Sequence, residues 1–119
     1  MSKSIDFNVS ISEKHHTKKI DKPSGTAIKI AEDILKNYSF SGWTLADEKN
    51  KLKINCERIG NEKGYHKVSY ESENDLISIS HNAKSRNGFA LGAVLCAEWI
   101  FEKKGIFTMN DFLKNINFS

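Results

Sequence analysis

The sequence predicts an α+β fold, and two patterns of apolar residues predict it. Apolar and polar residues alternate in four separate segments, which is the period of a β-strand with one buried face. Apolar residues recur instead at helical spacing after the first of these segments and again near the C-terminal end. With 119 residues the chain has the size of one ordinary domain, so we expect a single domain over residues 1–119.

The first strand is expected over residues 5–11, followed by a loop and a helix. Its alternating apolar residues are Ile5, Phe7, Val9 and Ile11. The polar stretch 13–22 does not continue this alternation, and Pro23 disfavours a helical conformation at Lys22, so a loop is expected there. Ser24 is then placed to cap a helix that reaches about Asn37.

Three further strands and two helices are expected after an irregular segment, 38–50, in which Trp43 anchors against the sheet. The later strands are predicted from the alternating residues of 52–56, 66–70 and 77–81. Because the connections 60–64 and 73–75 are short enough for hairpins, this half is predicted to be antiparallel. The helices are expected over residues 86–103, which are rich in small side chains, and from about Met109 to Asn115.

Composition and charge exclude several classes of protein. The formal net charge is only +3 with both signs interspersed, and the lysines of 14–22 lack interleaved aromatic residues, so nucleic-acid binding is disfavoured. The longest apolar stretch, 89–97, is about half the length of a membrane span, and we expect no membrane partner. No secretory signal precedes the first strand, which indicates a cytoplasmic setting. Cys56 and Cys96 are expected to be reduced core thiols.

The loop before the first helix is a candidate anion site. The backbone amides of Gly25 and Thr26 would lack partners within the helix and lie at the positive end of its dipole, with the hydroxyls of Ser24 and Thr26 nearby. Lys19 and the two adjacent imidazoles, His15 and His16, add charge and groups able to transfer protons. These residues together fit acid–base chemistry on an anionic substrate.

Other interpretations of the same residues are open. Ser24 and Pro23 also fit an ordinary capped helix after a solvated loop. Zinc binding is disfavoured, because adjacent histidines on an extended chain point apart and no ligand spacing is present around the four histidines, His15, His16, His66 and His81. Ser24 lies outside a G-x-S-x-G elbow, which disfavours a nucleophilic role.

Two blocks of residues resemble a known family. The first reads Glu13-x-His15-His16-x-x-Lys19-x-Asp21-x-Pro23-Ser24-Gly25-Thr26-Ala27. The second contains Arg58-x-Gly60-x-x-x-Gly64-x-His66 and then His81-x-Ala83-x-x-Arg86-x-x-Phe89-Ala90-x-Gly92-Ala93. Together they closely resemble the signature of 4-hydroxy-tetrahydrodipicolinate reductase, also called dihydrodipicolinate reductase, of bacterial and plant lysine biosynthesis. The resemblance covers nearly the whole chain.

This resemblance implies the family's substrate-binding and oligomerisation domain. The implied fold is a mixed, largely antiparallel four-stranded sheet with helices on one face, assembled as a homotetramer. His15 would donate or accept a proton, and Lys19 would assist it as a cation. The residues that would hold the substrate carboxylates are His16, Lys19, Ser24, Gly25 and Thr26. We expect the assembly to use the sheet face without helices, since Leu76 lies on the opposite face from Ile77 and Ile79.

The reaction that the resemblance implies needs a cofactor that this chain is not expected to hold. The family reduces 4-hydroxy-tetrahydrodipicolinate to tetrahydrodipicolinate with NADPH or NADH bound to an N-terminal Rossmann domain, and no G-x-G-x-x-G fingerprint is present here. The isolated chain is therefore expected to bind neither cofactor tightly and to be inactive alone. The alternative is a non-catalytic dicarboxylate-binding or oligomerisation domain, and cofactor binding by the isolated chain discriminates between the two.

Overall fold

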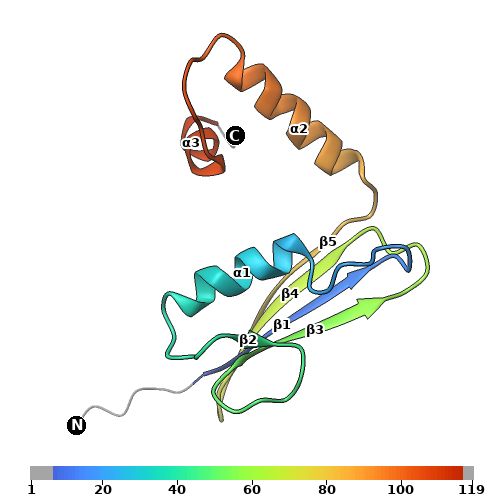
Figure 1. Cartoon of the computed structure of the whole chain (residues 1–119), viewed down its shortest axis with the longest axis vertical. Helices are drawn as coiled ribbons and strands as arrows, with labels where there is room; N and C mark the ends of the chain where they lie inside the picture. Colours follow the sequence, from blue (N-terminus) through green and yellow to red (C-terminus); the bar gives the residue numbers. More distant parts are fainter. Residues whose placement is uncertain (1–6, 117–119) are drawn as a thin grey trace. The chain divides into compact units, whose positions relative to one another are not determined.

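The computed structural model describes residues 7–116, and the chain divides into two compact units between Lys84 and Ser85 (Figure 1). The first unit contains a sheet and one helix, and the second contains two helices. Ile5, at the start of the first predicted strand, lies outside the described residues. Within residues 7–116 no helix is long and apolar enough to cross a membrane.

The sheet has five strands in the order β2-β3-β1-β4-β5. Their bounds are β1 Asn8–His15, β2 Trp43–Thr44, β3 Leu52–Arg58, β4 Tyr65–Glu71 and β5 Leu76–Asn82. β2 and β1 both pair with β3 in parallel, whereas β4 is antiparallel to both β1 and β5. The expected α+β fold with a mixed sheet is confirmed. The short strand β2 adds a fifth strand inside the segment predicted to be irregular.

The position of β1 differs from what the sequence predicts in two ways. β1 lies between β3 and β4, so the connection 60–64 does not close a hairpin, whereas the predicted hairpin at 73–75 does join β4 to β5. β1 also continues to His15 instead of ending at Ile11, because the buried face runs through Val9, Ile11 and Glu13. The sequence pattern does not predict this continuation, because Glu13 is charged. Hydrogen bonds from Ser24 and Arg58 compensate the burial of its carboxylate.

The helix α1, Gly25–Leu35, packs against this face of the sheet through small and aliphatic side chains. The predicted cap is confirmed, since the Ser24 side chain accepts a hydrogen bond from the amide of Ala27. The core formed between helix and sheet consists of Val9, Ile11, Ala27, Ala31, Ile34, Leu52 and Ile54. The two alanines allow the helix to approach the strands closely, which brings its N-terminal end against the ends of β1 and β3.

The two faces of the sheet differ in polarity. Strand register places Ile77 opposite Tyr70 and Ile79 opposite Val68, and both Val68 and Tyr70 pack against the core under α1. Ile77 and Ile79 therefore share the face of α1, where they are 53% and 68% exposed. Leu76 lies on the opposite face, as predicted, but most of its neighbours there are polar, including Ser10, Ser12, Lys53, Asn55, Lys67, Ser69, Ser78 and Ser80.

The second unit consists of α2, Asn87–Ile100, and α3, Met109–Asn115, close to the predicted bounds. Trp99 makes edge contacts with Phe107 and Phe112, whose ring centroids lie 5.5 and 5.7 Å away. α3 begins with a capping box in which Thr108 and Asp111 bond each other's backbone amides. Cys56 and Cys96 belong to different units, and both are partly buried and not in the fully buried core.

Candidate functional site

The centre of the candidate site is Glu13, a carboxylate on the central strand that is completely buried. One oxygen, Oε1, accepts hydrogen bonds from Arg58 Nη2 at 3.0 Å and from the Ser24 amide at 3.1 Å. The other oxygen, Oε2, accepts a short hydrogen bond from the Ser24 hydroxyl. Burial raises the pKa of Glu13, but the hydrogen bonds from Ser24 and Arg58 outweigh this effect and hold the pKa below its usual value. Glu13 is therefore ionised in the folded protein at neutral pH.

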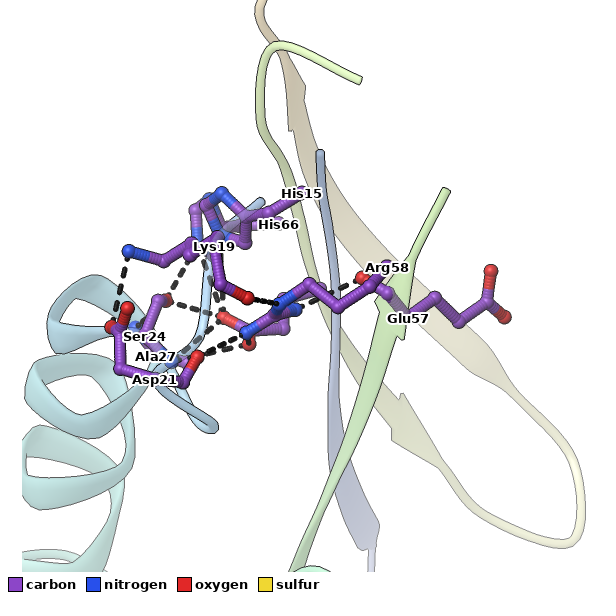
Figure 2. A network of polar contacts seen from close by, with 9 residues as sticks. His15, Lys19, Asp21, Ser24, Ala27, Glu57, Arg58 and His66 are labelled. Carbon is purple, nitrogen blue, oxygen red and sulfur yellow. Dashed lines mark hydrogen bonds and ion pairs between the residues drawn. The ribbon is translucent and has the colours of Figure 1, made fainter. Parts of the chain in front are cut away.

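Arg58, at the end of β3, fastens the loop between β1 and α1 to the sheet (Figure 2). Its guanidinium reaches Glu13 and also donates to two loop carbonyls, those of Lys19 at 3.2 Å and of Asp21. A planar donor fork is suited to hold several acceptors at fixed angles, and Lys would not reproduce it. The loop that carries Lys19 is thereby held beside the end of the sheet.

Ser24 joins the same network to the start of α1. Its hydroxyl donates to Glu13 and accepts from the amide of Ala27 at 3.2 Å, and its side chain is buried. The amides of Gly25 and Thr26, by contrast, meet no acceptor among residues 7–116, and both residues are exposed. A Cβ atom added at Gly25 would meet nothing within 4 Å, so the space beside this residue is open. These two amides are what the helix start presents to an anion.

Two imidazoles approach the buried carboxylate from neighbouring strands. The Nε2 atoms of His15 and His66 lie 3.5 and 3.6 Å from Glu13 Oε2, and the two rings meet edge to face with centroids 5.1 Å apart. His66 Nε2 also lies 3.3 Å from the Ser24 hydroxyl, whereas the buried Nε2 of His15 completes no hydrogen bond within the described residues. The unsatisfied Nε2 of His15 therefore faces the Glu13 carboxylate inside the network.

The protonation of this pair follows from its surroundings. Burial lowers the pKa of His15 below its usual 6.5, although Glu13 opposes the shift. Burial also lowers the pKa of His66, with the neighbouring His15 acting in the same direction. Both imidazoles are therefore mostly neutral near pH 7 in the free protein. A neutral imidazole accepts a proton readily, and an incoming anion would favour its protonated form.

The residues predicted for the site do not all take part equally. His15, Lys19 and Ser24 come together in one network (Figure 2), in which Lys19 Nζ lies 3.0 Å from the carboxylate of Asp21. This contact lowers the pKa of Asp21. His16 enters through its backbone alone among the bonds that the described residues show, its carbonyl accepting from the Lys19 amide at 3.2 Å.

The sequence argument missed the roles of Glu13, Arg58 and His66. All three stand in the two signature blocks, yet nothing in the local sequence shows that they meet. Register brings them together: Glu13 lies opposite His66 on β4, and His15 lies opposite Arg58 on β3. Once β1 is placed between β3 and β4, these residues must share the face of α1.

Metal binding and thiol chemistry are less suited to this cluster. Glu13, His15 and His66 bring ligand atoms within 4.8 Å of one another, so two of the four histidines do converge. However, the carboxylate is already bonded to Arg58 and Ser24, and a nearby guanidinium favours an anion over a divalent cation. Burial raises the pKa of the Cys56 thiol to about 11, together with its hydrogen bond to Glu13, so Cys56 is a poor nucleophile.

The fold and the site together define an α+β domain with a candidate anion site at a helix start. The family model described as dihydrodipicolinate reductase, C-terminus, matches residues 1–113 of this chain. The chain therefore belongs to the dihydrodipicolinate reductase C-terminal family, which confirms the resemblance of its signature blocks.

Several curated relatives carry the name 4-hydroxy-tetrahydrodipicolinate reductase. The relative from Christiangramia forsetii is 51% identical over 114 residues, that from Buchnera aphidicola subsp. Schizaphis graminum 41% over 120, and that from Rickettsia rickettsii 33% over 114. The matches cover 93%, 91% and 92% of this chain but 47%, 44% and 48% of the relatives. The chain thus spans about half the length of the curated relatives it matches.

A solved structure shares the fold. It is described as dipicolinate-bound dihydrodipicolinate reductase from Paenisporosarcina sp. TG-14 and matches with a TM-score of 0.62. The match covers 80% of this chain and 40% of that chain, at 24% sequence identity. At this level of identity the likeness concerns the fold alone.

Proposed function

We propose that this chain is the substrate-binding and oligomerisation domain of a 4-hydroxy-tetrahydrodipicolinate reductase. In the complete enzyme NADPH or NADH would reduce the cyclic dicarboxylate, a step of lysine and diaminopimelate biosynthesis in the cytoplasm. The observation that carries the proposal is the juxtaposition of the start of α1, where the amides of Gly25 and Thr26 lack acceptors among the described residues, with Lys19 and a neutral, partly buried His15. The names of the relatives support the same reaction.

Each residue has a specific task in this proposal. The amides of Gly25 and Thr26 and the ammonium group of Lys19 bind substrate carboxylates, because a helix start without acceptors and a nearby ammonium group both favour an anion. The bound carboxylates raise the pKa of His15, which takes up a proton and delivers it during reduction. Ser24 holds the helix start in place, since its hydroxyl is already bonded to Glu13 and Ala27. His16 is proposed to assist from the rim of the site.

Among the described residues, the connection between β1 and α1 is not suited to a dinucleotide cofactor. The connection between β1 and α1 carries Pro23 and Ser24 instead of a glycine-rich turn. Arg58 also donates hydrogen bonds to the carbonyls of Lys19 and Asp21 in this connection. We therefore propose that a Rossmann domain outside this sequence holds the nicotinamide. We also propose that the domain assembles as a homotetramer. The molar mass of the chain in solution, measured by light scattering, tests this assembly.

Calorimetry with dipicolinate, a planar dicarboxylate, tests the proposed substrate site. We expect the 119-residue chain to bind dipicolinate and Lys19→Ala to weaken this binding, because the substitution removes a charge that faces the ligand. Lys18→Ala is the matched control, since Lys18 is an exposed lysine in the same loop with no ion pair among the described residues. Equal loss in both variants would indicate nonspecific attraction, and no loss in Lys19→Ala would place the ligand elsewhere.

A further inference from the structure

The position of Glu13 is unusual for a purely structural residue. It continues the buried row of Val9 and Ile11 on β1, where an aliphatic side chain would pack under α1 without the cost of burying a charge. Its carboxylate instead receives two donors from Ser24 and one from Arg58, in addition to the hydrogen bond with the Cys56 thiol. A fully occupied carboxylate cannot rotate without breaking one of these bonds, so it forms a rigid point between the sheet and α1.

The same carboxylate is the shared neighbour of both imidazoles. His15 follows Glu13 by two residues on β1, and His66 lies directly across from Glu13 on β4, so both rings project from the same face. Their Nε2 atoms lie at nearly equal distances, 3.5 and 3.6 Å, from Oε2. One anion therefore influences which ring carries a proton and how both rings are oriented.

We propose that Glu13 is a positioning residue: its buried carboxylate, held by Arg58, fixes the start of α1 through Ser24 and sets the orientation and proton affinity of both His15 and His66. The inference rests on the proposed function for the identity of the ligand. It goes beyond that function because it assigns a task to three side chains, those of Glu13, Arg58 and His66, for which the signature alone gave none.

The charges around the pair decide the direction of the expected effect. Glu13 raises the pKa of both imidazoles, while the positive groups of Lys19 and Arg58 lower that of His15. On the other strands, His81 of β5 and Cys56 of β3 face the same region, and Lys22 lies near Cys56. Because Glu13 is the anion closest to both rings, its neutralisation should lower the pKa of both imidazoles further.

Nuclear magnetic resonance titration of isotope-labelled histidines in the 119-residue chain tests this directly. In Glu13→Gln we expect the pKa of His15 and of His66 to fall. Glu57→Gln is the matched control, because the side chain of Glu57 is exposed on the opposite face of the sheet. Unchanged titrations of His15 and His66 in folded Glu13→Gln would overturn the proposal.

A measurement on the unsubstituted chain keeps the test open if Glu13→Gln does not fold. The carboxyl carbon signal of Glu13 should shift with pH over the range in which the two imidazoles titrate, because each imidazole has its Nε2 atom within 4 Å of Glu13 Oε2. A Glu13 signal that stays constant through that range would overturn the proposal. A signal whose response to pH decreases in His15→Gln and also in His66→Gln would support it.

Dipicolinate binding separates failure of this inference from failure of the proposed function. If the chain binds dipicolinate but Glu13→Gln leaves both imidazoles and the affinity unchanged, the positioning role is wrong and the function stands. If the imidazoles respond to Glu13 but the chain does not bind dipicolinate, the function is wrong and the positioning role stands. Glu13→Asp should restore the charge effect on the imidazoles but not the affinity, since its shorter side chain cannot reach both Ser24 and Arg58.

Discussion

Glu13 and Arg58 form a buried ion pair, in which Arg58 Nη2 lies 3.0 Å from Glu13 Oε1. The side chain of Arg58 is 8% exposed and that of Glu13 is 0% exposed. The pair joins neighbouring parallel strands, β1 and β3, and the guanidinium extends the connection to the loop at Lys19 and Asp21. A charge pair of this kind contributes geometry more than stability, because desolvation offsets much of its attraction. Substitution of only one partner nevertheless lowers the stability of the folded chain, because it leaves the other charge buried and unpaired.

We predict that Arg58→Met destabilises the chain by about 3–5 kcal/mol, because the substitution leaves the carboxylate of Glu13 buried without its cation. Urea unfolding measures the loss. Lys53→Met is the control: the ion pair of Lys53 with Asp47 is closer, at 2.6 Å, but its side chains are 36% and 88% exposed. Loss of an exposed pair should cost about 1 kcal/mol or less. Equal costs would contradict the buried character of the Glu13–Arg58 pair.

The pKa of Glu13 predicts an acid-dependent stability. Since its pKa is lower in the folded chain than its usual 4.5, the unfolded chain binds more protons between the two values. The contribution of Glu13 is therefore fully present above the usual value and is lost as pH falls through the folded pKa. Thermal unfolding at a series of pH values should show a steeper acid loss in the unsubstituted chain than in Glu13→Gln. Parallel profiles would argue that Glu13 is not responsible.

Ser24 allows its two roles to be separated. If Ser24 acts only as a helix cap, Ser24→Gly should cost a few tenths of a kcal/mol, since Gly is tolerated at this position. Because the Ser24 hydroxyl also donates to the buried Glu13 carboxylate, we expect Ser24→Gly to cost about 1–3 kcal/mol in urea unfolding. Thr108→Gly at the cap of α3 is the control, where the hydrogen bond to Asp111 is exposed. Similar small costs at both caps would limit Ser24 to capping.

The lowered pKa of His15 predicts that anion binding is coupled to proton uptake. His15 is mostly neutral near pH 7, and a bound dicarboxylate favours the imidazolium form, so dipicolinate should bind more tightly at pH 6 than at pH 8. Calorimetry in buffers of different ionisation enthalpy measures the protons taken up. His15→Gln should reduce the uptake, whereas His16→Gln should leave most of it. Proton-independent binding by the unsubstituted chain would rule out His15 as the coupled group.

The sequence predicts the local elements well and the site only in part. Ser24 as a cap and the bounds of α1, α2 and α3 follow from residues within one or two helical turns, so short-range patterns suffice. The burial of Glu13 depends instead on β1 lying between β3 and β4, a long-range pairing that no local pattern contains. For the same reason His66, more than 50 residues after Glu13, becomes part of the site only through strand register.

The last prediction concerns turnover. Fused behind a Rossmann domain of the family, the chain should reduce its substrate, and His15→Gln should lower kcat by about 10²–10⁴-fold with a small change in KM, because proton delivery acts in the transition state. Lys19→Ala should impair both kcat and KM, since its charge contacts substrate before and during reaction. Lys18→Ala, exposed in the same loop, should leave both constants unchanged. Stopped reactions with NADPH and with NADH measure these constants. If the fusion turns over and His15→Gln has the same kcat as the unsubstituted fusion, the proton must come from another group, and His66 would be the next imidazole to substitute because it shares the carboxylate of Glu13.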